Sequence, residues 1–209
     1  MSAPLLIIQT GKPLPSLNRY GSFAHWIRVA AGLQARQTQV VDVSAGQPLP
    51  QLENLAAQLP VLGICYGHQL LAHALGGEVG FNPAGRESGT IALQLRAEAA
   101  DDPLFAGLPA TLPAHATHLQ TVLTPPPGAT VLAASARDNC QAFRVGPQAW
   151  GVQFHPEFAT HHMRGYLRER AQCIARHGGD ARQLVRQVHA APQARHLLRR
   201  FIRQTRLAA

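Results

Sequence analysis

A cysteine lies between two glycines at the point where an apolar run passes into a helix-like pattern. Residues 60–64 are apolar, and the spacing Gly63-x-Cys65-x-Gly67 overlaps their end. This spacing is typical of a nucleophile elbow, a sharp strand-to-helix turn in which side chains at the glycine positions would clash. A thiol there lies at a helix N-terminus, where the helix dipole and free N–H groups favour the thiolate. The motif therefore requires a strand that is followed at once by a helix.

Strand and helix patterns alternate through the N-terminal part of the chain. Three apolar runs predict strands, at residues 5–9, 39–43 and 61–64. Three further segments predict helices, at residues 23–31, 52–59 and 68–75. Ser22 is placed to cap the first helix, and Gly32 is placed to end it. This alternation is typical of a parallel sheet with helices packed against it.

The rest of the chain divides into a strand-rich part and a helical part. Short strands are expected in the middle, at residues 90–95, 129–134, 141–145 and 150–154. A helical pattern follows Phe158 and continues to the end. We therefore predict an α/β fold with an open, mostly parallel sheet flanked by helices, a strand-rich middle portion and C-terminal helices.

Basic residues concentrate at the C-terminal end of the chain. From Thr160 onward there are 11 arginines against one glutamate and one aspartate, whereas the preceding part holds 8 basic and 9 acidic residues. We expect residues 1–170 to form the main domain and residues 171–209 to form an arginine-rich helical extension packed on it. The charge is interpreted as a solvated helix face. No motif of a known nucleic-acid-binding fold accompanies the arginines, so nucleic-acid binding is disfavoured.

Several classes of protein are disfavoured by what the sequence contains. No apolar run approaches the ~20 residues of a membrane helix, and the apolar stretch at residues 5–8 is too short for a signal peptide. We therefore expect a cytoplasmic protein that does not contact a membrane. The three cysteines, Cys65, Cys140 and Cys173, are odd in number and far apart, which disfavours a disulfide framework.

A histidine that follows a late strand supplies the base that a cysteine nucleophile needs. His155 comes directly after the strand expected at residues 150–154, and catalytic groups of open α/β sheets collect at such strand ends. Glu157, two residues further on, can reach the imidazole and orient it. A metal site at His155 is disfavoured, because the adjacent His161 and His162 cannot easily face one ion from a helix. The pattern indicates nucleophilic catalysis by cysteine, histidine and glutamate.

Two longer motifs contain these residues in the order typical of one family. Gly63–Gln69 resembles the elbow, and Gly151–Glu157 resembles the His-Pro-Glu motif, of the class I glutamine amidotransferases. The chain is more narrowly similar to the stand-alone, GMP-synthase-like amidotransferases of bacteria through three segments, Asn82–Glu87, His115–Gln120 and Gln141–Arg144. The resemblance covers about residues 4 to 170 and implies a flavodoxin-like α/β fold.

The resemblance implies a mechanism for a glutamine amidotransferase. Cys65 would attack the side-chain carboxamide of glutamine, and His155, oriented by Glu157, would pass a proton to the departing ammonia. Water would then hydrolyse the γ-glutamyl thioester. The backbone N–H of Tyr66 would donate to the oxyanion.

The resemblance also implies where the substrate is held and what the protein works with. Gln69, one helical turn beyond the nucleophile, would contact the substrate, and Thr117 and His118 would hold the amino-acid end through backbone groups. The expected ligand is glutamine or a γ-glutamyl small molecule, without a cofactor or a metal ion. We expect any ammonia-accepting synthase to be a separate polypeptide.

One part of the family pattern has no counterpart in this sequence. The family has a strand and a Gly-rich loop before the elbow strand, and the loop donates the second N–H to the oxyanion. Only the 17 residues Ser44–Pro60 separate the strand ending at Val43 from the strand beginning at Val61, which is room for a crossover helix alone. We therefore expect the strand before the elbow strand to be deleted. Two alternative functions stay open, a catalytically impaired amidotransferase-like binding or regulatory protein and a γ-glutamyl peptide hydrolase.

Overall fold

The computed structural model describes residues 5–48 and 59–207. The largest sheet has six strands in the order β3-β10-β9-β8-β5-β6. Their bounds are Val61–Ile64 for β3, Ala149–Val152 for β10, Ala142–Val145 for β9, Ala129–Ala134 for β8, Glu87–Leu95 for β5 and Thr111–His118 for β6. Two smaller sheets are β1 (Leu5–Gln9) with β2 (Thr38–Asp42), and β4 (Glu78–Phe81) with β7 (Gln120–Thr124).

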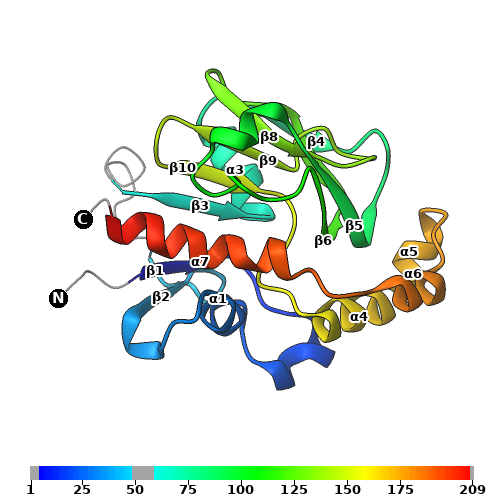
Figure 1. Ribbon diagram of the computed structural model, residues 1–209. Coiled ribbons are helices and arrows are strands. Elements are labelled where there is room, and N and C mark those ends of the chain that lie inside the picture. Colours follow the sequence, from blue (N-terminus) through cyan, green and yellow to red (C-terminus); the bar gives the residue numbers. More distant parts are fainter. Residues whose placement is uncertain (1–4, 49–58, 208–209) are drawn as a thin grey trace.

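Helices cover these sheets and make a mixed α/β architecture, as the sequence predicts (Figure 1). Their bounds are Phe23–Ala31 for α1, Tyr66–Ala74 for α3, Thr160–Glu169 for α4, Ala171–Arg176 for α5, Ala181–Gln187 for α6 and Pro192–Leu207 for α7. Helix α1 has the predicted limits: the Ser22 side chain accepts from the His25 N–H, and Gly32 ends the helix in the left-handed conformation.

Parallel pairing is less extensive than the sequence pattern indicates. Strands β1 and β2 are parallel, and so are β3 and β10, whereas the other pairs in the three sheets are antiparallel. The parallel pair β3–β10 is the one that matters for the site, because Ile64 lies opposite Val152 at the ends of these strands. Side chains that follow the two strands are therefore brought to the same edge of the sheet.

The pair β1–β2 forms a sheet of its own and does not join β3 within the described residues. After β2 the chain makes a short 3-10 helix at Val43–Ala45, and no strand occurs in residues 43–48 or 59–60. Most of the expected crossover, including the helix expected at residues 52–59, lies outside the described residues. The expected deletion of a strand there stays a prediction.

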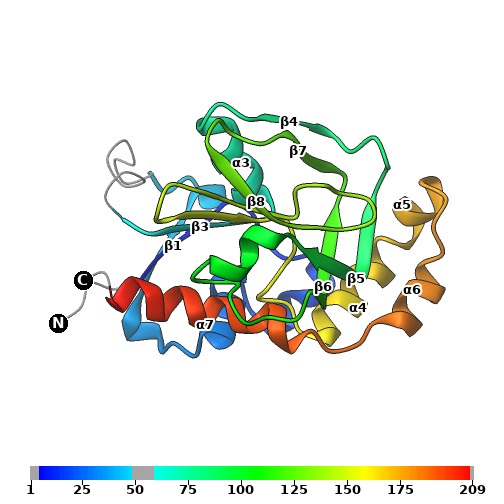
Figure 2. The same ribbon diagram turned by 45° about the horizontal axis from the view of Figure 1, so that its top comes forward.

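The C-terminal helix α7 packs between the large sheet and the layer formed by α1, β1 and β2. In Figure 1 it runs between the large sheet and the layer of α1, β1 and β2, and Figure 2 shows it along one side of the sheet. Its side chains Leu197, Leu198, Phe201 and Ile202 are buried in one cluster that includes Trp150 of β10. Helix α7 is thus part of the main hydrophobic core, while a domain boundary at residue 170 stays a prediction.

Most of the arginines described from Thr160 onward are exposed, as expected for a solvated face, and two arginines of α7 also bond to main-chain oxygens. Arg199 Nε donates to the oxygen of Ala30 at 3.3 Å. Arg200 donates to the oxygens of Leu104 and Ala106 at 2.9 and 2.7 Å. These bonds satisfy carbonyl groups beside the core. Across residues 5–48 and 59–207, no helix combines the length and apolar character needed to cross a membrane.

Candidate active site

The elbow at Cys65 is strained in the way that its motif predicts. Cys65 has φ 51° and ψ −104°, and it is the one non-glycine residue with positive φ in the described part of the chain. A Cβ on Gly63 would lie 2.5 Å from the carbonyl oxygen of Gly67, so glycine is required at position 63. The expected clash at Gly67 is wrong, because a Cβ there would meet nothing within 4 Å. The close approach of β3 to the first turn of α3 therefore requires glycine at position 63 but not at position 67.

His155 and Glu157 form a buried pair that follows β10. The imidazole Nδ1 lies 2.7 Å from Glu157 Oε1, and the exposed fractions of the two residues are 8% and 2%. The backbone N–H of His155 donates to the oxygen of His115 at 2.7 Å, and the imidazole stacks on Phe158 with ring centroids 4.1 Å apart. These contacts fix the position of the ring.

The charges around His155 keep its imidazole protonated at neutral pH. Burial by itself lowers the pKa of His155, but the Glu157 carboxylate and the Cys65 side chain more than offset this and raise it to about 10. Cys65 is also held beside the strand that leads to His155, since its N–H donates to the oxygen of Val152 at 2.8 Å. The three residues expected to form a triad are therefore brought together by the parallel strands β3 and β10.

A relay of two glutamine side chains leads from the start of β7 to the sulfur. Gln69 Nε2 donates to the backbone oxygen of Gln120 at 2.9 Å and to Gln153 Oε1 at 2.8 Å. A carbonyl oxygen only accepts hydrogen bonds, so Gln69 donates from its NH₂ group. The side chain of Gln153 accepts this bond through its amide oxygen. The NH₂ group of Gln153 consequently faces Cys65 Sγ, at 3.6 Å. Gln153 lies within the quoted motif around His155, yet its role is visible only in the fold.

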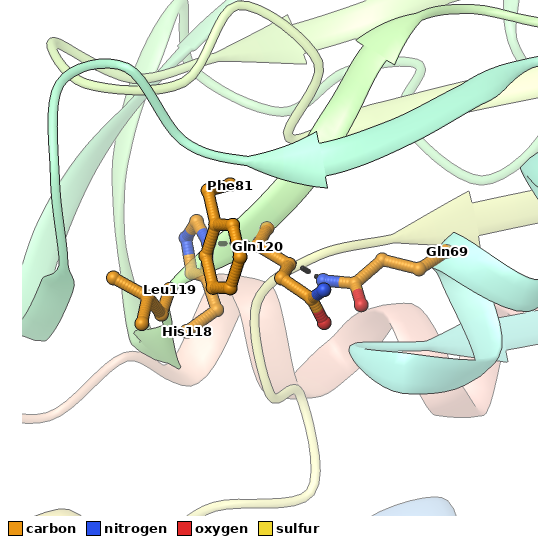
Figure 3. A pocket seen from close by; sticks show the side chains of 5 residues that line it. All are labelled: Gln69, Phe81, His118, Leu119 and Gln120. Atoms are coloured by element: carbon orange, nitrogen blue, oxygen red, sulfur yellow. Dashed lines mark hydrogen bonds between the residues drawn. The ribbon is translucent and has the colours of Figure 1, made fainter.

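A cavity of about 340 Å³ opens beside this relay. It is lined by Gln69, Phe81, His118, Leu119 and Gln120, and Figure 3 shows these side chains with the two hydrogen bonds to the Gln120 oxygen. The volume is in the range of small-molecule sites. Among the lining residues, Gln69 is the one that links the cavity to the elbow, because it lies one helical turn from Cys65 on α3.

Two of the four predicted substrate residues line this cavity, and two do not. Tyr66 is 55% exposed at the first position of α3, where backbone N–H groups lack helical partners. Gln69 and His118 line the cavity. Thr117 is partly buried and pairs with Ser88 in the β5–β6 register, and it does not line the cavity.

Glu87 is a buried carboxylate next to the candidate site, and its sequence motif does not indicate a role for it. Its exposed fraction is 4%, and it lies 3.1 Å from His118 Nε2, 2.8 Å from Ser135 Oγ and 2.6 Å from Gln141 Nε2. The other ring nitrogen of His118 lies 2.9 Å from the oxygen of Gln120. The network fixes the end of β6 against β5 and the segment before β9. The quoted segments of the sequence contain Glu87 and Gln141, but only the fold shows that they meet.

His68 lies next to the elbow but is part of the core. It is fully buried, its ring is 4.8 Å from that of Phe143, and neither ring nitrogen has a hydrogen-bond partner in the described part of the chain. Burial lowers the pKa of His68 to about 3. The folded protein therefore holds a neutral imidazole that the unfolded chain protonates below pH ~6.5.

Replacing His68 by leucine is expected to reduce the loss of stability at acid pH. As the pH falls from about 6.5 towards 3, the unfolded chain binds a proton at His68 that the folded protein does not, so the free energy of unfolding decreases. H68L removes this term and lowers the slope by about 1.4 kcal/mol per pH unit between pH 4 and 6. Urea unfolding at several pH values measures the slope. His73→Gln, on the exposed side of the same helix, is the control, and an equal slope in H68L and wild type would contradict the prediction.

Comparison with known families decides what kind of site this is. The family described as "Glutamine amidotransferase class-I" matches residues 29–171, which is more than half of the chain and includes the elbow and the His155–Glu157 pair. The chain belongs to the class I glutamine amidotransferases. The resemblance drawn from the two motifs is thereby confirmed.

Curated relatives of this amidotransferase are larger proteins. The chain is 44% identical over 122 residues to the GMP synthase [glutamine-hydrolyzing] of Thermus thermophilus, covering 57% of the chain and 23% of the relative. It is 33% identical over 181 residues to the protein of the same name from Parafrankia sp., covering 78% of the chain and 33% of the relative. The chain thus spans about a quarter to a third of these relatives.

Solved structures share the fold along almost the whole chain. A glutamine amidotransferase from Thermotoga maritima matches with a TM-score of 0.75 at 21% identity, covering 98% of both chains. One from Methylobacillus flagellatus matches with a TM-score of 0.72 at 22% identity, covering 98% of this chain and 96% of the other. At these identities the likeness concerns the fold, and it includes the C-terminal helices.

Proposed function

We propose that this amidotransferase hydrolyses the side-chain amide of glutamine through a cysteine thioester, with Cys65, His155 and Glu157 as the catalytic triad. The observation that carries the proposal is the 2.7 Å contact between His155 Nδ1 and Glu157 Oε1, on a segment that follows the strand paired with the elbow strand. The glutamate orients the ring, and the strained elbow presents the sulfur to it.

The first half of the reaction forms the thioester. The Cys65 sulfur attacks the amide carbon of glutamine, and its electron pair forms the S–C bond while the carbonyl oxygen becomes an oxyanion. The free N–H groups at the start of α3, including that of Tyr66, are placed to stabilise this charge. Collapse of the tetrahedral intermediate breaks the C–N bond. The proton held on His155 goes to the leaving nitrogen, which departs as ammonia.

The second half releases glutamate and restores the enzyme. His155, now neutral, takes a proton from water as the water oxygen attacks the thioester carbon. The C–S bond then breaks, and the electron pair returns to the sulfur as thiolate. Gln153 donates to Sγ from the buried side at 3.6 Å, so it stabilises the thiolate both before attack and as the leaving group. Gln69 keeps the Gln153 amide in this orientation.

The cavity next to the relay is the proposed site for the amino-acid end of glutamine. His118 lines it, and the network at Glu87 holds the main chain of Thr117 and His118 in place. Gln69 Nε2 is already bonded to two protein oxygens, whereas its Oε1 has no partner in the described part of the chain. The amide oxygen of Gln69 is therefore the atom that would meet an ammonium group of the substrate.

The ammonia acceptor is proposed to be a separate synthase in the cytoplasm. Both GMP synthases compared above are named as glutamine-hydrolyzing, and each is about three to four times the length that this chain matches. The exposed side chains of Tyr66, Leu70 and Phe81 lie on α3 and β4, the elements that carry the site, so a partner can reach the site from this side.

A catalytically impaired binding protein is the second candidate. The observation that favours it is the separation of the β1–β2 sheet from β3 within the described residues, because the family's second oxyanion donor comes from a Gly-rich loop that accompanies a strand between them. Removing one oxyanion donor lowers kcat by about 10²–10³. Such a protein would still bind glutamine and react slowly at Cys65.

Covalent labelling distinguishes these candidates. The protein is incubated with an electrophilic glutamine analogue, and the modified peptide is identified by mass spectrometry while glutamate production is measured in parallel. The proposal predicts an adduct on Cys65 that excess glutamine prevents, together with catalytic release of glutamate. An adduct without turnover would favour the impaired protein. Labelling that ignores glutamine, with no release of glutamate, would overturn both.

A further inference from the structure

A second cavity is lined by several basic side chains. It shares no lining residue with the cavity beside the Gln69–Gln153 relay. Its volume is about 450 Å³, and we call it the basic pocket. It lies between the 3-10 segment Pro15–Tyr20, helix α1 and the first turn of α4. Its basic side chains come from four parts of the chain: Arg19, His25, His161, His162 and Arg195. No aspartate or glutamate is among its lining residues.

The two arginines of the basic pocket have no carboxylate partner within the described residues. Arg19 takes part in no ion pair or side-chain hydrogen bond there, and its guanidinium carbon lies 4.8 Å from the centre of the Tyr20 ring. Arg195 donates one bond, to the backbone oxygen of Glu157 at 3.0 Å, while the carboxylate of Glu157 contacts His155. Most of the N–H groups of both guanidinium groups are therefore available to a ligand.

His162 adds a donor whose direction can be assigned. Its exposed fraction is 5%, and its Nδ1 accepts a hydrogen bond from the N–H of Ala159 at 3.1 Å. Burial, followed by the nearby His161 and Arg195, lowers the pKa of His162 to about 3, so the ring is neutral at pH 7. A neutral ring that accepts at Nδ1 carries its proton on Nε2. This Nε2–H has no partner in the described part of the chain.

Aromatic contacts hold these groups in position without a ligand. The ring of His162 stacks on Trp26 with centroids 4.0 Å apart and an interplanar angle of 17°. The ring of His161 lies 4.5 Å from that of Tyr20. The imidazole of His162 therefore keeps its place when the pocket is empty, which lowers the entropic cost of binding through its Nε2–H.

We infer that the basic pocket binds a phosphate group, either as inorganic phosphate or as part of a small phosphomonoester. The pocket presents the guanidinium groups of Arg19 and Arg195 and the Nε2–H of His162, which are donors only. Phosphate oxygens accept from such donors, and arginine forks match their geometry. Because Arg195 also contacts the Glu157 backbone, one side chain joins this pocket to the candidate triad.

Titration with orthophosphate tests the inference in the intact protein. Trp26 lines the pocket, whereas Trp150 is buried in the main core, so a saturable change in tryptophan fluorescence reports binding, with calorimetry as a second measurement. The ionic strength is held constant with chloride. Arg19→Gln is expected to weaken binding about tenfold or more, because it removes a charged donor. Arg36→Gln, an equal change of charge at an exposed residue outside the pocket, leaves the affinity unchanged.

Two further measurements distinguish inorganic phosphate from a phosphomonoester as the ligand and test the Nε2–H donor of His162. Binding of phenyl phosphate in place of orthophosphate would identify a phosphomonoester ligand. His162→Phe keeps a ring against Trp26 and removes the Nε2–H, so it too is expected to weaken binding. The inference is overturned if neither phosphate compound saturates, if acetate binds as tightly, or if R19Q and R36Q behave alike. Thermal unfolding of each variant confirms that it is folded.

Discussion

Replacing Cys65 by alanine is expected to lower the rate of glutamine hydrolysis by about 10⁴-fold or more. The sulfur is the atom on which the proposed thioester forms, and alanine offers no nucleophile in its place. The neighbouring groups cannot compensate, because His155 and Gln153 both act on that sulfur. The measurement is the release of glutamate by purified protein at saturating glutamine.

The matched control for this substitution is Cys173→Ala. Cys173 is also a free, partly buried thiol, but it lies on α5 and outside the candidate site. We expect C173A to keep the activity of the wild type. The proposal of cysteine catalysis would be refuted by C65A protein that is folded and retains activity within tenfold of the wild type.

Replacing Phe201 by alanine is expected to destabilise the protein by about 3–5 kcal/mol. Phe201 is 5% exposed on α7 and meets Trp150 edge to face, with ring centroids 6.2 Å apart. Its removal leaves a cavity where α7 packs on the large sheet. For a chain of this length, the corresponding decrease in Tm is about 10 °C. Thermal and urea unfolding measure the change.

Arg203→Ala provides the comparison for Phe201, two residues further along the same helix. Arg203 is exposed, so its replacement should change stability by no more than about 0.5 kcal/mol. Equal effects of F201A and R203A would show that α7 does not belong to the core. That outcome would favour a separate C-terminal extension that packs only loosely on the rest of the protein.

Local sequence patterns predict the elements around the elbow with good accuracy. The strand at Val61–Ile64 and helix α1 at Phe23–Ala31 have the predicted limits, and α3 begins two residues before its predicted start. These elements carry strong local signals, such as an apolar run, the Ser22 cap and the terminal Gly32. The strands β4, β6 and β7 are not predicted; Gly80 in β4 and Pro113 in β6 weaken the local strand signal.

The same distinction applies to the candidate site. The elbow and the motif around His155 are each contiguous, so both can be read from the sequence. The relay from Gln69 to Gln153 joins residues 84 positions apart, and the contact of Gln153 with Cys65 joins residues 88 positions apart. Glu87 likewise acquires its partners from β6 and from the segment before β9. No local pattern contains these pairs.

The sequence by itself determined the elbow around Cys65, the places of His155 and Glu157 after a late strand, and the family. These features depend on neighbouring residues, whose spacing sets the backbone conformation directly. The tertiary structure decided that strands β3 and β10 lie side by side, that Gln153 faces the sulfur, and that basic side chains from four segments share one pocket. The physical reason is that strand pairing and burial bring together groups whose hydrogen-bond partners and charges are set by the fold, at distances along the chain that no local motif spans.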